Sequence, residues 1–217
     1  MTASGSLPRA VISLSALGEA ARAAVAAGGE VADLRGDALG HGASRVAEIV
    51  RDAGVRAVLL DGSVPAGEAD IDSVLLYGLP GSGRVPAMTL SGRVLSVKPL
   101  RAGEAVSYGY THRAEADTTV ALVTGGYAQG VVRALGNSAH VEVDAVLRPI
   151  VGRVAMDVCV VDLQDPASSV EPGAEVVFFG GAGPARDALS TWSSATGLRM
   201  TELIAVAGAK AVRQWTR

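Results

Sequence analysis

Cysteine is nearly absent from the 217-residue chain, and Cys159 stands alone. A single thiol excludes an intrachain disulfide bond, which favours a reducing compartment. Cys159 lies in an apolar run, where a buried and inert thiol is expected rather than a nucleophile. The chain also lacks a continuous run of ~20 apolar residues, so no membrane span is expected. Its first residues contain no signal-peptide core either. These absences predict a cytoplasmic protein.

Aromatic residues and lysine are also scarce. Aromatic side chains make up 4% of the residues, so the core has to be built from Ala, Val and Leu. The net charge of −3 argues against nucleic-acid binding, which normally needs a strongly basic face. The three histidines are far apart in sequence, which predicts no metal site. Lys98 and Lys210 are the only lysines, so any lysine-dependent chemistry has two candidates.

The first 65 or so residues alternate strand-like and helix-like segments. Strands are expected near residues 10–14, 30–34 and 56–60, with helices at 15–27, capped by Ser15, and 43–53. This βαβαβ pattern favours parallel strands. The turn formers of residues 61–67 predict a linker.

From Pro86 onward the pattern becomes one of alternating strands separated by Gly and Pro, which predicts a mostly antiparallel β-domain. The expected strands are residues 88–97, 118–123, 140–143, 149–154, 156–163 and 175–179. A helix is expected at 184–194, and residues 201–207 read as a mixed segment. The fold class is therefore α+β, with a βαβ unit at residues 1–73 and a β-domain at 74–217.

Three ordered motifs stand out in the β-domain. Residues 106–112 read VSYGYTH, residues 126–130 read GYAQG and are followed by RALGN at 133–137, and residues 151–157 read VGRVAMD. Each one alone is compatible with an ordinary structural loop. In this order and spacing they resemble the C-terminal domain of the alanine racemase family, the fold-type III pyridoxal phosphate enzymes. That family has V-S-Y-G-R-T-Y, G-Y-A-D-G with R-A-L-S-N, and V-G-R-V-C-M-D.

The front of the chain resembles an abridged form of the same family's barrel. Residues 12–17, ISLSAL, are similar to its opening I-D-L-D-A-L, and residues 34–42, LRGDALGHG, to its cofactor motif V-K-A-D-A-Y-G-H-G. Arg35 stands where that motif has the cofactor lysine. Because a complete (β/α)₈ barrel takes ~250 residues, the front part is too short to be one.

The resemblance implies specific roles for residues of the surviving motifs. In the family the lysine forms a Schiff base with pyridoxal phosphate, and the G-Y-A tyrosine from the neighbouring subunit is the opposed base. That role maps onto Tyr127, while Met156 and Asp157 approach the substrate. A phenol needs a nearby cation to work near neutral pH, and Arg153 and Arg133 are the candidates.

The same resemblance leaves the cofactor side incomplete. A guanidinium stays protonated and cannot form an imine, so no confident cofactor-binding residue remains and pyridoxal phosphate is implied by resemblance only. The family's phosphate-contacting tyrosine aligns loosely with Thr201. The expected function is that of a degenerate homolog without racemase activity of its own.

Two alternatives remain open. The chain could supply its tyrosine side to a full-length racemase in trans, which predicts a heterodimer, or a homodimer among copies of itself. Alternatively it could be an enzyme, either of altered chemistry around Tyr127 or an active pyridoxal-phosphate-dependent isomerase of L- and D-alanine. For the front strands, whose edges need cover, we expect an open layer packed on the β-domain or pairing across a dimer.

Overall fold

The computed structural model describes residues 7–62 and 68–217. The strands are β1 (Arg9–Ser13), β2 (Val31–Asp33), β3 (Ala57–Leu59), β4 (Met88–Leu100), β5 (Ala105–Val106), β6 (His112–Arg113), β7 (Thr118–Thr124), β8 (His140–Val143), β9 (Val146–Val151), β10 (Val158–Asp162), β11 (Glu175–Phe179) and β12 (Val212–Thr216). The helices are α1 (Leu14–Ala26), α2 (Arg35–Leu39), α3 (Ala43–Asp52), α4 (Ser73–Leu76), α5 (Ala188–Thr196) and α6 (Met200–Lys210), with short 3₁₀ turns η2 (Tyr127–Gln129) and η3 (Arg133–Leu135).

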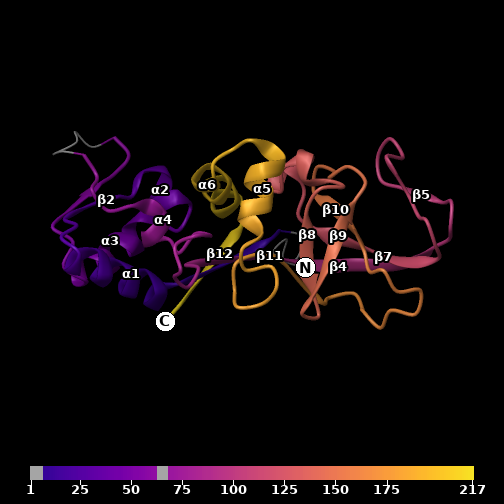
Figure 1. Cartoon of the computed structure of the whole chain (residues 1–217), viewed down its shortest axis with the longest axis horizontal. Helices are drawn as coiled ribbons and strands as arrows, with labels where there is room; N and C mark the ends of the chain where they lie inside the picture. Colours follow the sequence, from indigo (N-terminus) through magenta and orange to yellow (C-terminus); the bar gives the residue numbers. More distant parts are fainter. Residues whose placement is uncertain (1–6, 63–67) are drawn as a thin grey trace, which may run out of the picture.

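The largest element is an eight-stranded sheet in the order β11-β8-β9-β10-β7-β4-β1-β12. An additional pairing of β11 with β4 closes six of these strands into a barrel. Every pairing in this sheet is antiparallel except that of β1 with β12. The prediction of a mostly antiparallel β-domain is therefore confirmed, and Figure 1 shows it as the half of the molecule opposite α1 and α3.

The core is mostly aliphatic, as the low aromatic content requires. Its few aromatic side chains are concentrated where α5 meets β11: Trp192 lies edge-on to Phe179, with ring centroids 5.3 Å apart, and to Phe178 at 6.3 Å. All three rings are fully buried. Edge-to-face packing of this kind adds to the free energy gained by burying the rings. These contacts therefore stabilise the position of α5 on the barrel.

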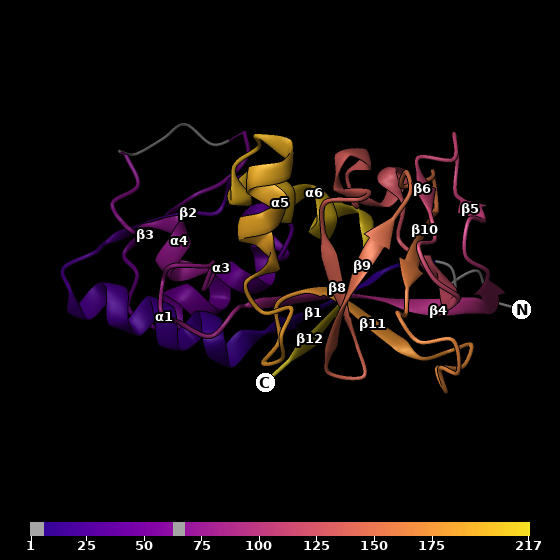
Figure 2. The same cartoon turned by 45° about the vertical axis from the view of Figure 1, so that its right-hand side comes forward.

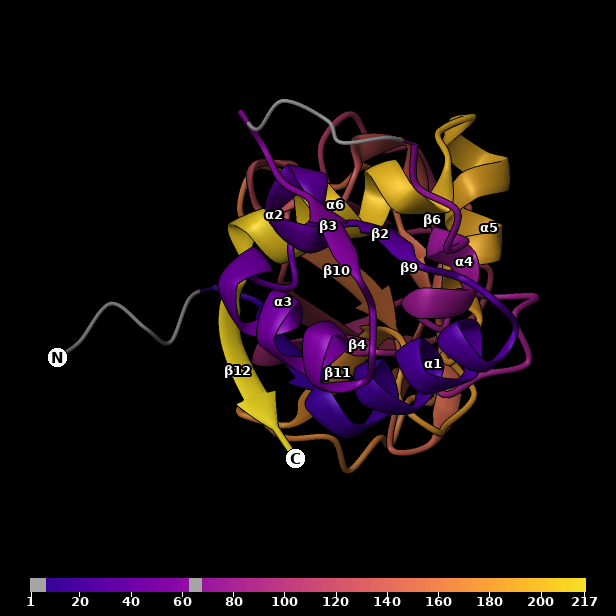
Figure 3. The ribbon, with the colours of Figure 1, turned by 90° about the vertical axis from the view of Figure 1, so that its left-hand side faces the viewer.

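The front of the chain forms a small separate layer. β2 and β3 pair in parallel, and α1 and α3 pack together below them in the view of Figure 3, in front of the large sheet. One continuous apolar core joins this layer to the barrel. The front layer is therefore packed on the β-domain, which was the first of the two arrangements expected for it. The free edge of β2 is covered by the chain near Asp70, whose carboxylate accepts the amides of Glu30 and Val31 at 2.9 and 2.7 Å.

The strand expected near residues 10–14 is present as β1, but it does not join the parallel strands of the front layer. β1 does not pair with β2; it lies between β4 and β12 in the large sheet. Both of its edges are occupied there, and the buried side chains of Ala10 and Ile12 join the common core. Residues 1–73 thus contribute a strand to the large sheet, and the domain boundary after residue 73 stays a prediction. The predicted linker falls largely on residues 63–67, outside the described residues.

Other local predictions also need correction. The cap of α1 is Ser13, whose hydroxyl accepts the Ala16 amide at 3.1 Å, rather than Ser15. The mixed segment 201–207 is part of the regular helix α6, and β12 follows it as a strand that the sequence pattern did not predict. The helix expected at 184–194 begins later, at Ala188. In the described part of the chain, no helix has the length and apolar character needed to span a membrane.

Candidate functional site

Tyr127 lies at the start of η2, in a bend that packs directly on the turn at residues 155–157. Its amide donates to Ala155 O at 2.9 Å, and the next amide, of Ala128, donates to Met156 O at 3.0 Å. A Cβ on Gly126 would lie 2.2 Å from Met156 O, so only glycine allows the two backbones to approach this closely. The glycine-rich bend therefore fixes Tyr127 beside Met156 and Asp157.

The Tyr127 ring is partly exposed and stacked on a cation. Its exposed fraction is 42%, and the Arg133 guanidinium carbon lies 4.6 Å from the ring centroid. Such a cation–π contact holds the ring in place and puts positive charge beside the phenol. Of the two arginines named as candidates, Arg133 is the one that stacks on this ring.

Arg153 has a different place in the structure. Its carbonyl accepts the Ser107 hydroxyl at 2.6 Å, which joins the turn at residues 151–157 to the VSYGYTH segment. The amide of Gly152, the preceding residue, donates to Asn137 Oδ1 at 2.6 Å, and Asn137 Nδ2 donates to Thr111 at 3.2 Å. The motifs predicted from sequence are therefore assembled through hydrogen bonds, and Asn137 of RALGN joins two of them.

Met156 and Asp157 are both exposed on this surface, Met156 by 54%. Asp157 Oδ1 accepts a long hydrogen bond of 3.5 Å from the side-chain amide of Gln129, which is buried. Gln129 therefore reaches from the bend that carries Tyr127 to the carboxylate of the neighbouring turn. We call the side chains of Tyr127, Arg133, Met156 and Asp157 the tyrosine face.

Arg35 lies at the other end of the candidate site, directly after β2. Its guanidinium forms a two-point ion pair with Asp33, with Nε–Oδ1 at 2.8 Å and Nη2–Oδ2 at 2.5 Å. This side-chain hydrogen bond from Arg35 holds the pKa of Asp33 below its ordinary value. The Arg35 side chain is 54% exposed, so the pair is held by geometry more than by burial.

The residues after Arg35 form a left-handed turn. Asp37, Ala38 and Leu39 have φ of 54°, 54° and 50°, a conformation that costs about 1–2 kcal/mol for each non-glycine residue. The Asp61 carboxylate accepts the Gly36 and Asp37 amides at 3.0 and 3.1 Å. The Asp37 carboxylate in turn accepts the Ala43 amide at 2.8 Å and pairs with an arginine of β12, Arg213.

His41 follows this left-handed turn, and its side chain packs beneath it. It is fully buried, and its Nδ1 lies 2.9 Å from Ala38 O. Its ring centroid is 4.6 Å from that of Tyr77, and its carbonyl accepts the Trp215 indole N–H at 3.0 Å. Burial lowers the pKa of His41 to about 4. The sequence carries no local signal for the roles of Tyr77, Arg213 and Trp215, because their partners lie far away in the chain.

A cleft of about 810 Å³ opens beside Arg35. Thr201 and Arg199, at the start of α6, line it together with Arg35 and the α4 residue Ser73. Thr201 and Arg35 therefore line the same cleft. Of the described residues, those lining the cleft include none of the tyrosine face. A single chain therefore presents its two candidate half-sites as separate surfaces.

Comparison with known proteins gives the family. Residues 87–215, more than half of the chain, match the family model described as "Alanine racemase, C-terminal domain". The chain belongs to the alanine racemase family. Among its relatives are the alanine racemases of Corynebacterium efficiens, 49% identical over 127 residues, and Mycobacterium ulcerans, 37% identical over 169 residues. These matches cover 54% and 71% of this chain, but only 35% and 44% of the relatives' length.

Solved alanine racemases share the fold. The enzyme from E. faecalis superimposes with a TM-score of 0.81 at 17% identity, and that from Streptomyces coelicolor with 0.80 at 20%. Both aligned spans cover 96% of this chain and 98% of the other chain. At these identities the likeness establishes the fold of this family member and nothing finer.

The Arg35 cleft does not fit the cofactor link of the alanine racemase family. No lysine lines it; Lys98 lies in β4, and Lys210 is exposed at the end of α6. The Arg35 guanidinium, which stands in the lysine's place, is paired with Asp33. The side-chain hydrogen bond to Asp33 raises the pKa of Arg35 above its ordinary value. A Schiff-base link to pyridoxal phosphate therefore has no amine in this cleft.

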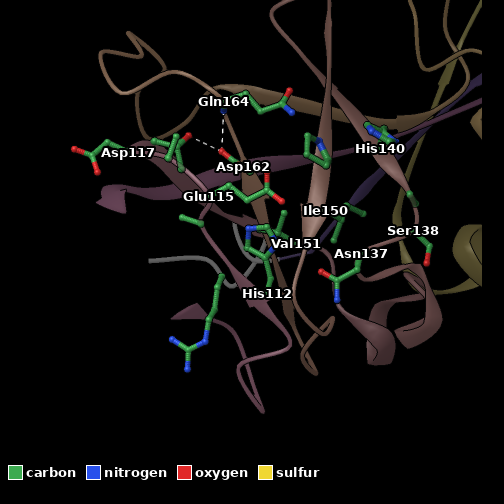
Figure 4. A pocket seen from close by; sticks show the side chains of 16 residues that line it. His112, Glu115, Asp117, Asn137, Ser138, His140, Ile150, Val151, Asp162 and Gln164 are labelled. Carbon is green, nitrogen blue, oxygen red and sulfur yellow. Dashed lines mark hydrogen bonds between the residues drawn. The ribbon is translucent and has the colours of Figure 1, made fainter. Parts of the chain in front are cut away.

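A second concavity lies on the barrel (Figure 4), and its lining, in the described part of the chain, includes no residue of the tyrosine face or of the Arg35 cleft. Its volume is about 490 Å³, and its wall includes His112, Glu115, Asp117 and Asp162. Asp162 is already bonded there to the Thr118 hydroxyl, at 2.6 Å. No group of three or more histidine, cysteine or carboxylate residues with metal-binding geometry occurs in residues 7–62 and 68–217.

Proposed function

We propose that this chain is a degenerate alanine racemase homolog without racemase activity of its own. The observation that carries the proposal is the ion pair of Arg35 with Asp33 at the position of the cofactor lysine. A guanidinium with a pKa above about 12 offers no free amine to a carbonyl group.

The test is a titration with pyridoxal phosphate, followed by borohydride reduction and peptide mass analysis. We expect no visible imine absorbance, no reduced adduct on Lys98 or Lys210, and no interconversion of L- and D-alanine. Variant Arg35→Lys supplies the missing amine at the family position and is the positive control for the adduct. Racemisation by the unaltered chain, or a stoichiometric adduct on either natural lysine, would overturn the proposal.

A second function is favoured by the state of the tyrosine face. The three sequence motifs around this face are joined by hydrogen bonds, yet Tyr127 and Met156 are 42% and 54% exposed. Tyr108 and Tyr110 of the VSYGYTH segment are 83% and 69% exposed. Such a surface is suited to complete the site of a full-length racemase in trans, in a heterodimer. A homodimer through this face would give no active site, because neither copy carries the lysine.

Complementation tests this second function directly. A full-length racemase whose own G-Y-A tyrosine is replaced by phenylalanine is mixed with this chain at micromolar concentration. Restored activity that is lost with Tyr127→Phe supports supply of the base in trans. Tyr108→Phe is the matched control, since it removes another exposed phenol of the same surface. No association by co-purification rejects this function and leaves the first proposal standing.

A further inference from the structure

A small pocket lies on the barrel between a three-strand face and the segment that carries β5. It is lined by Ser96 and Lys98 of β4, Val120 and Leu122 of β7, Val160 of β10, and Val106 and Ser107. Its volume is about 240 Å³. Figure 2 shows β5 and β6 standing beside the end of β4. None of these residues belongs to the tyrosine face or the Arg35 cleft.

The strand register builds the floor of this pocket. Ser96 is paired with Leu122, and Leu122 with Val160, so one row crosses three strands. Lys98 is paired with Val120 in the next row on the same face, because side chains two residues apart point to one side of a strand. The floor is therefore an apolar surface with a hydroxyl and an amine along one border.

The roof is fixed before any ligand arrives. Ser107 has a φ of 64°, and its hydroxyl donates to Arg153 O at 2.6 Å. Val106 packs in a small separate core with Val120 and Val151. Both roof residues are thus attached to the barrel, Ser107 by this hydrogen bond and Val106 by packing on Val120 and Val151, so the pocket is preformed. The Ser107 hydroxyl proton is already used, so Ser107 contributes shape rather than a donor.

Lys98 supplies an uncompensated positive charge. Among residues 7–62 and 68–217, no ion pair or hydrogen bond is found for its ammonium group, and no acidic side chain lines the pocket. Asp162 shares the row of Lys98 and Val120, but two strand spacings, about 10 Å, separate it from Lys98. Its carboxylate already accepts the Thr118 hydroxyl. The charge that complements this pocket is therefore negative.

We propose that this pocket binds a short-chain aliphatic carboxylate. The hydrocarbon lies over the partly exposed Leu122 and Val160, and the carboxylate accepts hydrogen bonds from Lys98 Nζ and Ser96 Oγ. A charge-assisted bond from an ammonium group is the stronger of the two. Because the pocket is smaller than the usual range for drug-sized ligands, the ligand has roughly four to six carbon atoms.

The scarcity of lysine makes a direct test feasible. Reductive methylation with ¹³C-formaldehyde keeps the positive charge and labels the two lysines and the amino terminus. Titration with 3-methylbutanoate is expected to shift one lysine signal saturably in the millimolar range. That signal is assigned to Lys98 by its absence in Lys98→Arg, and Lys210→Arg is the matched control. The Lys210 signal is expected to stay unchanged.

Two neutral or shortened probes and one variant separate the contributions. The isosteric amide, 3-methylbutanamide, and acetate are each expected to bind at least tenfold more weakly than 3-methylbutanoate. Ser96→Ala, an exposed substitution, is expected to weaken binding about three- to tenfold without unfolding the protein. Equal shifts of both lysines, equal affinity for the amide, or a shift that never saturates would overturn the proposal. Since Arg35 and Tyr127 take no part, the result is independent of the racemase question.

Discussion

Protonation of His41 is predicted to control the stability of the protein in mild acid. The residue is fully buried, and burial lowers its pKa to about 4 from an ordinary value of 6.5. The hydrogen bonds of its Nδ1 to Ala38 O and Leu39 O oppose this shift, and the nearby charges of Arg213 and Asp37 act in opposite directions. The folded protein therefore favours the neutral form of the His41 ring.

The effect of His41 on the free energy of unfolding follows from the difference in its proton binding between the folded and the unfolded chain. Between pH 6.5 and 4 the unfolded chain binds a proton at His41 that the folded chain excludes, so stability is complete above pH 6.5 and falls as the pH drops. Each pKa unit corresponds to about 1.4 kcal/mol. The loss is therefore about 2.5 kcal/mol by pH 4.5 and about 3 kcal/mol by pH 4.

Urea unfolding of the unaltered protein and of His41→Asn, at pH 7 and pH 4.5, measures the contribution of His41 protonation to the free energy of unfolding. Asparagine keeps a donor for Ala38 O but does not titrate, so the difference between the two proteins removes the contribution of other groups. We expect the stability advantage of the unaltered protein over the variant to shrink by about 2.5 kcal/mol at the lower pH. A difference that stays constant within about 0.5 kcal/mol would show that His41 is not excluded from protonation in the folded state.

Two further predictions concern the barrel. Gly126→Ala is expected to cost about 1–3 kcal/mol of unfolding free energy in denaturant titrations and to loosen the Arg133 contact of Tyr127, because the new Cβ meets Met156 O; unchanged stability would contradict the close approach. Cys159 is fully buried, and burial raises its pKa to about 12. At pH 8 we expect an aromatic disulfide reagent to label it about a thousandfold more slowly in native buffer than in urea, and similar rates would refute this burial.

The sequence predicted the β-domain well because its information is local or carried by motifs. The alternation in residues 158–162 reappears as β10 with Cys159 and Val161 buried. The motif resemblance related Tyr127 to Met156 and Asp157, and backbone hydrogen bonds from residues 125–128 to residues 155–157 hold the two segments side by side. Glycine at 126 was the local signal for that close approach.

The front end was predicted less well, because distant contacts decide its structure. A left-handed turn at Asp37, Ala38 and Leu39 contradicts the preference of each residue, and it is held by partners at Asp61 and Arg213. No periodicity of residues 34–42 reveals a partner more than 170 residues away. The pairing of β1 with β12 escaped prediction for the same reason.

That pairing has a consequence for biogenesis. β1 is made before its parallel neighbour β12, which emerges about 200 residues later. At translation rates of about 5–20 residues per second, one edge of β1 waits roughly 10–40 s for its partner. During that interval Asp37 lacks its arginine and His41 lacks the indole of Trp215. The nascent front end can be protected meanwhile by the pairing of β1 with β4, and its final shape is set only once β12 has been made.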